Sequence, residues 1–364
     1  MDLDQLLNVP VSTPQEAIDA ARNVIQVLIQ RNQRLSPQLV RLGFHDCVGG
    51  CDGCVDLDNV NNNGLLHPIQ QLGPVVNAYA QHGVSRADIW ALAATTGADV
   101  AQGREQVNFD FDFYGRVNCE DAASAAGVEC TNADGQVVPC DATHGPHRVL
   151  PSPDLNTHGV MEYFRLTFGF TMEQTVALMG AHTLGGLRHI NSGFEGNGGR
   201  VRQQDVLNNA YYAGLVVGES VDSTEAELFD APNWTQDEIE NGDLDDVPNR
   251  FRWNRGGSGG GNGGRGDGPN GVDVGLRRLQ GGGSGGRGNG GGGGGGRGGG
   301  GGQQIMLNAD IGLVHDFGVN GMKIQERYFV TFKRTRMILP KLLFVPRLVH
   351  LGRWQSTGST TCCG

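Results

Sequence analysis

Between Gly256 and Gly302 the chain consists largely of glycine, with five arginines among the glycine runs: Arg265, Arg277, Arg278, Arg287 and Arg297. Glycine loses more conformational freedom on folding than any other residue, and it brings no side chain to bury. We therefore expect this segment to be a flexible, low-complexity insert. A fold must come from residues 1–255 and 303–364, roughly 315 residues, which suffice for one discontinuous domain with a sizeable core.

The whole chain of 364 residues carries a formal net charge of -11. A net negative charge argues against the binding of phosphate groups, such as those of nucleic acids, as the main function of the protein. The few Arg-Gly-Gly steps of the insert are typical of nucleic-acid-binding tails, but no aromatic residues are interleaved for base stacking. No run of about 18 apolar residues exists, so no membrane-spanning helix is expected.

The compartment stays open on the sequence alone. The first 14 residues lack the basic region and the apolar core of a signal peptide, although Met1 is also compatible with a truncated start. An even number of cysteines, clustered in loops, indicates disulfides if the protein is secreted, and free thiols or metal ligands if it is cytosolic. The eight cysteines are Cys47, Cys51, Cys54, Cys119, Cys130, Cys140, Cys362 and Cys363.

Helical periodicity dominates the chain outside the insert. Capping boxes that begin at Thr13, Ser85 and Thr171 predict the starts of three helices. A fourth helix is expected over Thr157–Phe168, where Gly169 ends it. Between Asn108 and Pro151 the periodicity is lost, and we expect a long loop stapled by cysteines.

The stretch RLGFHDCVGGCDGC, Arg41 to Cys54, combines residue types that can do chemistry. Arg41, Phe44 and His45 are three and four residues apart, so they share one face of a helix. Ser36 followed by Pro37 predicts the start of that helix. The alternative is an ordinary amphipathic helix whose Arg and His are solvated or locally paired.

The loop that follows offers two kinds of metal ligand. Its acidic residues could give carboxylate oxygens to Ca²⁺, or could simply be solvated; they are Asp46, Asp52, Asp56 and Asp58. Cys47, Cys51 and Cys54 have the short spacing of a zinc site, with His45 and His67 near. The second ligand pair of such a site does not follow, so a disulfide between two of the three cysteines is the simpler interpretation.

Two residues far along the chain sit in apolar surroundings. His182 is expected in the last turn of the helix that starts at Thr171, on the face of Leu178 and Met179, where a buried structural His is the usual interpretation. Asp310 is flanked by apolar residues that should be buried, and a buried carboxylate needs a partner.

Taken together, three segments resemble the plant, fungal and bacterial haem peroxidase superfamily. RLGFHDC is similar to its distal-helix motif, MGAHTLGG to its proximal-helix motif, and MLNADIGLV to the segment with its buried aspartate. VSRADIWALAA and LPSPDL resemble its connecting elements, and SGFEG is closest to its ascorbate-peroxidase-like class. The resemblance spans Val11 to Phe332 and is interrupted by the insert. It implies a mostly α-helical, two-lobed fold with haem b between the lobes.

The resemblance also implies roles for individual residues. His182 would bind the haem iron, and Asp310 would accept a hydrogen bond from its other ring nitrogen. His45 would act as general base toward H₂O₂ and then as acid toward the departing hydroxide, with Arg41 stabilising the developing charge. Phe44 would keep the distal side apolar. Asn62, flanked by Asn61 and Asn63, matches the Asn that orients the distal His.

Several positions depart from the family pattern. Gly198 stands where ascorbate-peroxidase-like members carry a proximal Trp, and Asn191 where ascorbate peroxidases hold their substrate with an Arg. Asp46 and Asp52 match distal calcium ligands, but Cys54 replaces a Ser. Thr183 matches a proximal cation ligand, whereas Asn208 replaces an Asp.

The sequence thus supports two hypotheses of different classes. The favoured one is a haem peroxidase that oxidises small reducing donors with hydrogen peroxide. The alternative is a secreted matrix or assembly protein on a peroxidase scaffold, in which the glycine-rich insert binds matrix partners and peroxidase activity is weak or serves cross-linking.

Overall fold

The structure is a computed structural model, and it describes a large part of the chain. The described residues are 2–103, 111, 113–119, 129–131, 135–139, 141–145, 147–188, 191, 199–215, 234–239, 250–255 and 304–313. They all belong to one compact unit, Met1–Arg255 with Gly302–Gly364. The glycine-rich insert 256–302 and Gly198 lie outside the described residues, so the predictions about them stay predictions.

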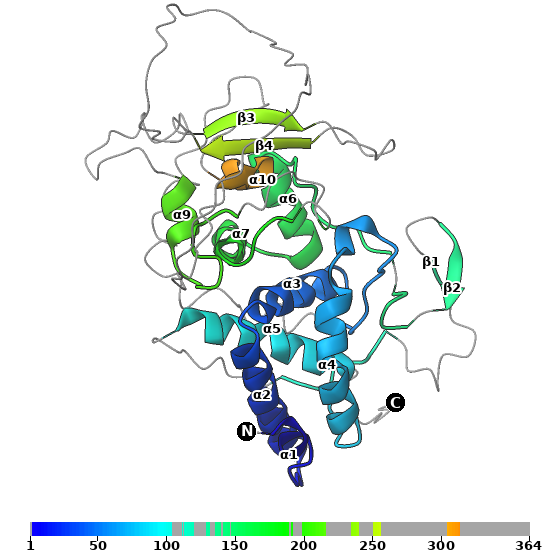
Figure 1. Cartoon of the computed structure of the whole chain (residues 1–364). Coiled ribbons are helices and arrows are strands. Elements are labelled where there is room, and N and C mark those ends of the chain that lie inside the picture. Colours follow the sequence, from blue (N-terminus) through cyan, green and yellow to red (C-terminus); the bar gives the residue numbers. More distant parts are fainter. Residues whose placement is uncertain are drawn as a thin grey trace, which may run out of the picture. The chain divides into compact units, whose positions relative to one another are not determined.

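Most of the described elements are helices (Figure 1). The α-helices are α1 (Leu3–Leu7), α2 (Pro14–Arg31), α3 (Leu35–Cys47), α4 (Leu66–Ala80), α5 (Arg86–Gln102), α6 (Thr157–Phe168), α7 (Met172–Met179), α9 (Ala210–Leu215) and α10 (Asn308–Ile311). Two 3₁₀ turns are η1 (Val60–Asn62) and η2 (Gly180–Thr183). The predicted mostly α-helical fold is confirmed; its division into two lobes stays a prediction. None of the helices described here combines the length and the apolar character needed to cross a bilayer.

Short strands accompany the helices. β1 (Glu129–Thr131) and β2 (Val137–Pro139) form an antiparallel hairpin. β3 (Trp234–Ile239), β4 (Arg250–Arg255) and β5 (Ile305–Leu307) form an antiparallel sheet in the order β3-β4-β5. The hairpin corrects the expectation of a plain loop between Asn108 and Pro151. Because β1 and β2 are only three residues long, they are too short to show the alternation of apolar and polar residues that predicts a strand.

Local capping chemistry sets most helix starts. The side chains of Thr13, Ser85 and Thr171 each accept a hydrogen bond from the backbone N–H three residues later. The side chain at that later position in turn accepts from the backbone N–H of the capping residue. At the other end of α6, Gly169 adopts the left-handed conformation, with φ 66°. These boundaries agree with the predicted ones.

The start of α3 differs from the prediction. The helix begins at Leu35, and Ser36 lies inside it, where its hydroxyl donates to the carbonyl oxygen of Gly97 on α5 at 2.7 Å. A tertiary hydrogen bond thus takes the oxygen that local sequence assigned to a cap. Gly43 of α3 is equally tied to α5, because a Cβ there would lie 2.4 Å from the Cβ of Ala94. The two helices therefore pack at a distance that only glycine permits.

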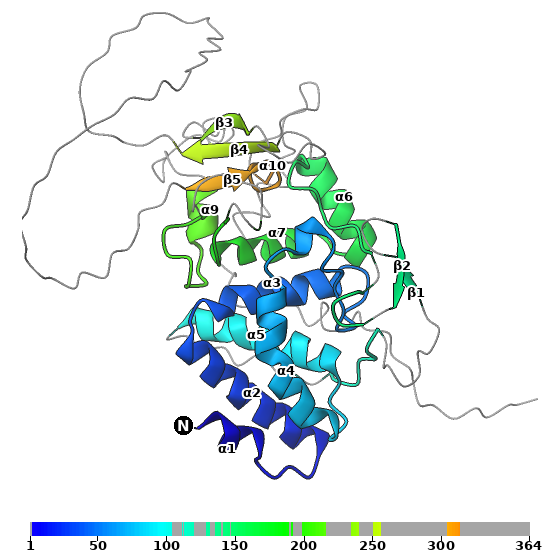
Figure 2. The same ribbon diagram turned by 45° about the vertical axis from the view of Figure 1, so that its right-hand side comes forward.

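Two clusters of buried apolar side chains hold these helices together. One is built by α2, α4, α5 and one side of α3, and includes Trp90 and Tyr79. The other joins α3 and α5 to α6, α7 and α9, and includes Phe164 and Tyr212. In Figures 1 and 2, α7 lies beside α3. At the turn after η2, a Cβ on Gly185 would lie 3.2 Å from the Cβ of Pro37 on α3.

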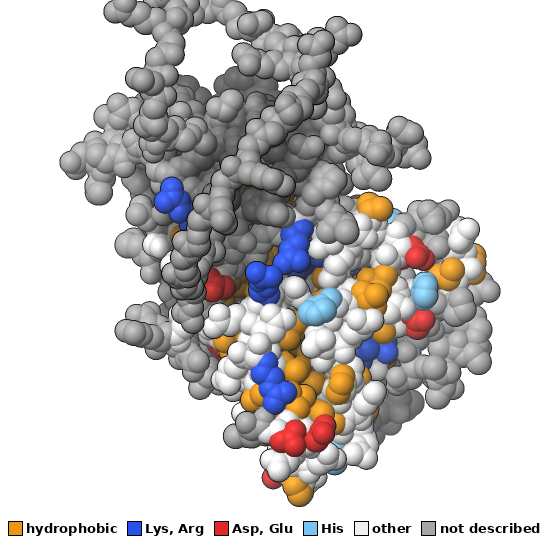
Figure 3. Space-filling view, in the orientation of Figure 1, with side chains coloured by type: hydrophobic (Ala, Val, Ile, Leu, Met, Phe, Trp, Pro, Cys, Tyr) orange, Lys and Arg blue, Asp and Glu red, His pale blue; other side chains and the backbone are white. Residues whose placement is uncertain are grey.

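The surface drawn in Figure 3 carries its charges in a scattered pattern. The basic side chains of the described residues, all of them Arg, stand singly or in pairs among uncharged ones, and acidic side chains are interspersed. On this face the described residues form no broad basic patch.

Candidate active site

His45 is held by an asparagine from η1. Its Nδ1 lies 2.7 Å from Oδ1 of Asn62, while Nδ2 of Asn62 donates to the carbonyl oxygen of Asp56 at 2.7 Å. Because the amide nitrogen already serves Asp56, the oxygen must face His45, so Nδ1 carries the proton. Nε2 of His45 is then unprotonated and can accept a proton.

Arg41 lies one turn before His45 and binds the same loop. Its guanidinium donates to the carbonyl oxygens of Asn61 at 2.7 Å and Asn63 at 2.8 Å. Burial lowers the pKa of Arg41 to about 10, which leaves it charged at neutral pH. The three consecutive asparagines therefore have different tasks: the outer two hold Arg41 through their backbone, and Asn62 holds His45 through its side chain.

Burial is also the main reason why the pKa of His45 falls to about 3. The charge of Arg41 lowers the pKa further, and the hydrogen bond to Asn62 opposes the shift. At neutral pH the imidazole of His45 is therefore uncharged. A neutral imidazole beside a permanent cation can receive a proton while the cation stabilises a developing negative charge.

Phe44 makes one wall of this region apolar. Its ring lies edge-on to His45, with centroids 5.8 Å apart, and contacts Phe164 and Phe168 of α6 at 6.2 and 6.1 Å. Tyr163 and Phe170 extend the aromatic cluster. These rings cover one side of His45 with apolar surface, which adds to the burial that lowers its pKa.

His182 is the centre of a second group of contacts. It lies on η2, because α7 ends at Met179 and the chain tightens into a 3₁₀ turn; the predicted last α-helical turn is thus corrected. Nδ1 of His182 lies 2.6 Å from Oδ1 of Asp310 on α10. The His182 side chain is 35% exposed and that of Asp310 is fully buried, so the imidazole reaches outward from a buried anchor.

Asp310 is ionised in this environment. Burial acts to raise its pKa, but the nearby Arg200 and His182 hold the pKa well below its usual range. For His182, burial and Arg200 lower the pKa, and Asp310 opposes the shift. A carboxylate accepts and cannot donate, so Nδ1 of His182 carries the proton and its Nε2 offers a lone pair.

Two partners of Asp310 were not predicted from the sequence. Arg200 donates through Nε to Oδ2 at 2.7 Å, and the hydroxyl of Tyr211 donates to Oδ1 at 2.8 Å. The backbone N–H of Leu307 adds a bond to Oδ2 at 2.9 Å. Burial and the carboxylate raise the pKa of Tyr211 well above its usual value. The sequence could have pointed to Tyr211, because it lies in the apolar segment at α9, where a hydroxyl is expected to be buried. It could not have pointed to Arg200, because nothing in the local sequence distinguishes Arg200 from the nearby Arg202.

The two histidine groups border the same apolar cluster without a hydrogen bond between them in the described part of the chain. Val40 and Cys47 of α3 belong to that cluster, as do Met179 and Leu184, which flank η2. Each histidine has its Nδ1 bound to an acceptor, and no hydrogen bond to its Nε2 is found among the residues that the structure describes. The fold thus brings two imidazoles, each held through its Nδ1, to one apolar core.

Comparison with known proteins agrees with this arrangement. The family model described as Peroxidase matches residues 21–241, more than half of the chain. The chain belongs to the peroxidase family. This family implies a haem cofactor.

Individual peroxidases are related at modest identity. The probable L-ascorbate peroxidase 5, chloroplastic, of Oryza sativa subsp. japonica is 32% identical over 191 residues, 48% of this chain and 52% of that protein. Peroxidase RIP1 of Medicago truncatula is 29% identical over 186 residues, 47% and 50% of the two chains. The putative heme-binding peroxidase of Yarrowia lipolytica is 29% identical over 175 residues, 44% and 50%. The chain spans about half the length of the curated relatives it matches.

The residues around His182 fit the haem of the peroxidase family. Haem iron takes an imidazole whose other nitrogen is commonly bound to a carboxylate or carbonyl, which fixes the tautomer and raises the basicity of the ligand. His182 fits this pattern, because its Nδ1 is bound to Asp310 and none of the described residues forms a hydrogen bond to its Nε2.

Thr183, predicted as a proximal cation ligand, is fully buried, and its hydroxyl lies within hydrogen-bonding distance of the carbonyl oxygens of Gly180 at 2.8 Å and Asn208 at 3.0 Å. The side-chain oxygen of Asn208 accepts from the backbone of Ala210 at 2.8 Å. These polar groups satisfy one another. Cation binding by Thr183 stays a prediction.

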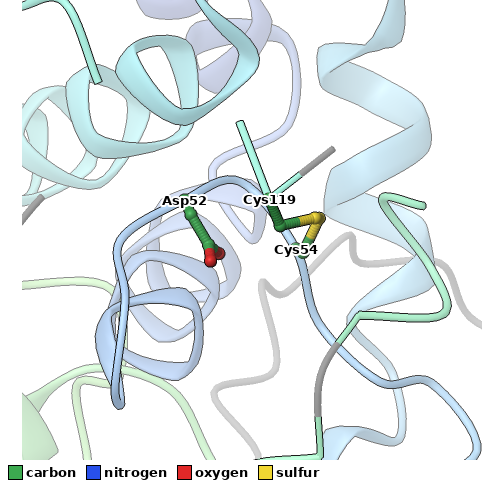
Figure 4. A group of neighbouring side chains, drawn as sticks. All are labelled: Asp52, Cys54 and Cys119. Atoms are coloured by element: carbon green, nitrogen blue, oxygen red, sulfur yellow. A yellow bond between two sulfur atoms is a disulfide. The ribbon is translucent and has the colours of Figure 1, made fainter. Parts of the chain in front are cut away.

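The cysteines of the loop after α3 form disulfides. Cys47 pairs with Cys51, which confirms the predicted bond between two of the three clustered cysteines, and Cys54 pairs with Cys119. Ligand atoms of Asp52, Cys54 and Cys119 lie within 4.8 Å of one another, and Figure 4 shows these side chains together. Because both sulfurs are shared in a disulfide, they offer no thiolate to zinc.

The two disulfides should contribute unequally to stability. Cys54 and Cys119 close a loop of 65 residues and Cys47 and Cys51 one of four. In the chain-entropy description the first is worth about 4 kcal/mol and the second about 2 kcal/mol. We expect Cys54→Ser/Cys119→Ser to lower the free energy of unfolding in urea about twice as much as Cys47→Ser/Cys51→Ser. Equal losses from the two matched double variants would contradict this.

Proposed function

We propose that the protein is a haem peroxidase that binds haem b through His182 and oxidises small reducing donors with hydrogen peroxide. One observation carries the proposal: two histidines at one apolar core each have Nδ1 bound to an acceptor, Asn62 or Asp310, at 2.6–2.7 Å. This leaves one imidazole as a base and the other as a ligand. Since the chain matches only about half of each relative, its activity rests on this chemistry and on family membership.

In this proposal the chain's own residues handle the protons and charge. Haem, when bound, supplies the iron at which hydrogen peroxide is reduced. Nε2 of His45 takes a proton from H₂O₂ and returns it to the departing hydroxide, which leaves as water. The positive charge of Arg41 stabilises the negative charge that develops on the departing oxygen. Asn62 keeps Nδ1 of His45 protonated, so that Nε2 remains the accepting atom.

The reducing donor is proposed only as a class. Asn191 lies next to Gly64, because a Cβ on Gly64 would be 2.6 Å from Nδ2 of Asn191. An amide at this position brings no positive charge to an anionic donor. Ascorbate is therefore not the donor that we propose, although two of the related proteins are named ascorbate peroxidases. Small neutral donors, such as phenols, fit better.

We do not extend the proposal to a calcium ion at Asp46 and Asp52, since Arg148 already binds these residues. The alternative of a matrix or assembly protein depends on the insert 256–302, and nothing in the described residues favours it.

Addition of haem to the full-length protein tests the proposal. A Soret band should appear with one haem per chain, and H₂O₂ should then drive the oxidation of guaiacol. His182→Ala should lose the Soret band, while Arg202→Ala, an exposed neighbour of the site, should keep it. A Soret band without dye oxidation would reject the activity but retain haem binding, and the absence of a Soret band would reject both.

The pH dependence of the reaction with H₂O₂ follows from His45. Because its pKa is lowered to about 3, the base stays neutral and active at higher pH and is lost as the pH falls through about 3. In stopped-flow mixing, the rate constant should be flat between about pH 5 and pH 8. A step near pH 7 would instead point to Asp46, whose pKa burial raises to about 7.

A further inference from the structure

A guanidinium lies between the two acidic residues that resemble calcium ligands. Nη2 of Arg148 is 2.5 Å from Oδ2 of Asp52, and Nη1 is 2.6 Å from the carbonyl oxygen of Asp46 and 4.0 Å from its Oδ1. The Arg148 side chain is 12% exposed and that of Asp46 1%. A fixed positive charge thus faces both carboxylates in a largely buried setting.

The same contact completes the end of α3. The last carbonyl groups of a helix lack intrahelical partners and carry partial negative charge. The carbonyl oxygen of Asp46 lies in this last turn, directly after His45, and accepts from Arg148 and from the backbone N–H of Cys51 at 3.0 Å. Arg148 therefore acts as a cation at the helix C-terminus as well as between the carboxylates.

The backbone is shaped around this side chain. A Cβ on Gly50 would lie 2.8 Å from Nη2 and 2.9 Å from Nη1 of Arg148. Gly49 has a φ of 82°, and a Cβ there would be 3.6 Å from Cδ of Arg148. Two consecutive glycines thus leave a cradle that the guanidinium fills.

The residues present do not fit a calcium ion. Calcium requires six to eight oxygen ligands. Oδ1 of Asp46 accepts from the backbone N–H of Cys54 at 3.0 Å, Oδ2 of Asp52 is bound to Arg148, and the sulfur of Cys54 is in a disulfide. Of the four carboxylate oxygens of Asp46 and Asp52, two, Oδ2 of Asp46 and Oδ1 of Asp52, are buried without a hydrogen-bond partner among the described residues, which is fewer than a calcium ion requires.

We infer that Arg148 takes the place of the distal cation: its guanidinium, seated on Gly49 and Gly50, braces the loop after His45, and the protein binds no calcium there. The charge that a bound ion would supply is part of the chain. This inference concerns folding of the loop and does not depend on haem binding or on peroxidase activity.

Thermal unfolding of the haem-free, full-length protein tests it directly. The melting temperature of the wild type should be the same in EDTA and in about 10 mM CaCl₂, a concentration that saturates even weak calcium sites. Isothermal titration of the EDTA-treated protein with CaCl₂ should give no binding heat. A calcium-dependent rise in melting temperature, or a stoichiometric binding isotherm, that Asp52→Asn abolishes would overturn the inference; a calcium effect that survives Asp52→Asn would belong to the site predicted at Thr183.

Arg148→Ser should make the melting temperature depend on calcium, because the guanidinium that replaces the ion is then missing. In EDTA it should melt below the wild type, because Asp46 and Asp52 are left without their cation, and CaCl₂ should restore part of the loss. The matched control is Arg165→Ser, since Arg165 is exposed and pairs only with Glu162 of its own helix in the bonds described. If Arg148→Ser melts no lower than Arg165→Ser, Arg148 does not brace the loop.

Gly50→Ala keeps Arg148 and displaces its guanidinium, so the test survives if Arg148→Ser fails to fold. The added methyl would occupy the space of Nη1 and Nη2. We expect a lower melting temperature in EDTA and a partial gain in CaCl₂. Gly73→Ala, on α4 with nothing within 4 Å of its Cβ, should show neither change. Equal behaviour of the two alanine variants would contradict a cradle at Gly50.

Discussion

Replacement of His45 by leucine should lower the rate of the reaction with H₂O₂ by about 10² to 10⁴, the usual contribution of a positioned general base. Leucine removes Nε2 and fills a similar volume next to Phe44, so the fold and the binding of haem should persist. The loss should appear in the second-order rate constant from stopped-flow mixing, with an unchanged Soret absorbance before mixing. Asn62→Ala should lower this rate by a smaller factor, because it removes the hydrogen bond that orients the imidazole of His45 but leaves the imidazole in place.

The matched control for His45→Leu is His67→Leu. His67 lies at the start of α4, is exposed, and pairs with Gln38 at 2.7 Å. It takes the same substitution but has no contact with Asn62 or Arg41, so the rate should stay within about twofold of the wild type. Normal reaction of the His45→Leu protein with H₂O₂ would reject the mechanism and leave haem binding intact.

Asp310→Ala should be the most destabilising single substitution at the site. It removes the common acceptor of His182, Arg200 and Tyr211 and leaves a largely buried guanidinium without its counter-charge. Breaking a buried ion pair by removing one partner typically costs about 3–5 kcal/mol. Urea unfolding of the haem-free protein should show this loss, and the haem-loaded variant should release haem more readily.

A double-mutant cycle separates the charge pair from the rest. Arg200→Leu together with Asp310→Ala should be less destabilised than the sum of the two single variants, because neither charge is then left alone. Asp205→Ala, an exposed acid in the same segment, should change the free energy of unfolding by less than about 0.5 kcal/mol. Additive losses for the first pair would show that Asp310 and Arg200 do not depend on each other.

Much of the local structure could be predicted because its causes lie within a few residues. The capping boxes at Thr13, Ser85 and Thr171 and the terminal Gly169 marked four helix ends correctly. The prediction failed where distant partners intervene. Ser36 bonds to Gly97 of α5 instead of capping α3, and the chain tightens at η2 just where it presents His182.

The candidate site was predictable in its residue types and not in its contacts. The spacing of Arg41, Phe44 and His45 placed them on one helical face, and that follows from the helical repeat alone. The sequence matched Asn62 to the residue that holds His45, but a shift of one residue would have selected Asn61 or Asn63 instead. Only the turn η1 decides it, because it directs the side chain of Asn62 inward and the carbonyl oxygens of its neighbours toward Arg41.

The sequence by itself therefore determined the helical class, the family resemblance and the two histidines, since these depend on periodicity and on short motifs. Only the tertiary structure decided the charges around them. Arg200 lies 110 residues from Asp310, and Arg148 lies 96 from Asp52. An ion pair depends on distance and burial after folding, and neither is encoded in the neighbourhood of either residue. For this reason the sequence could suggest a calcium ion after His45, and only the fold could put an arginine there.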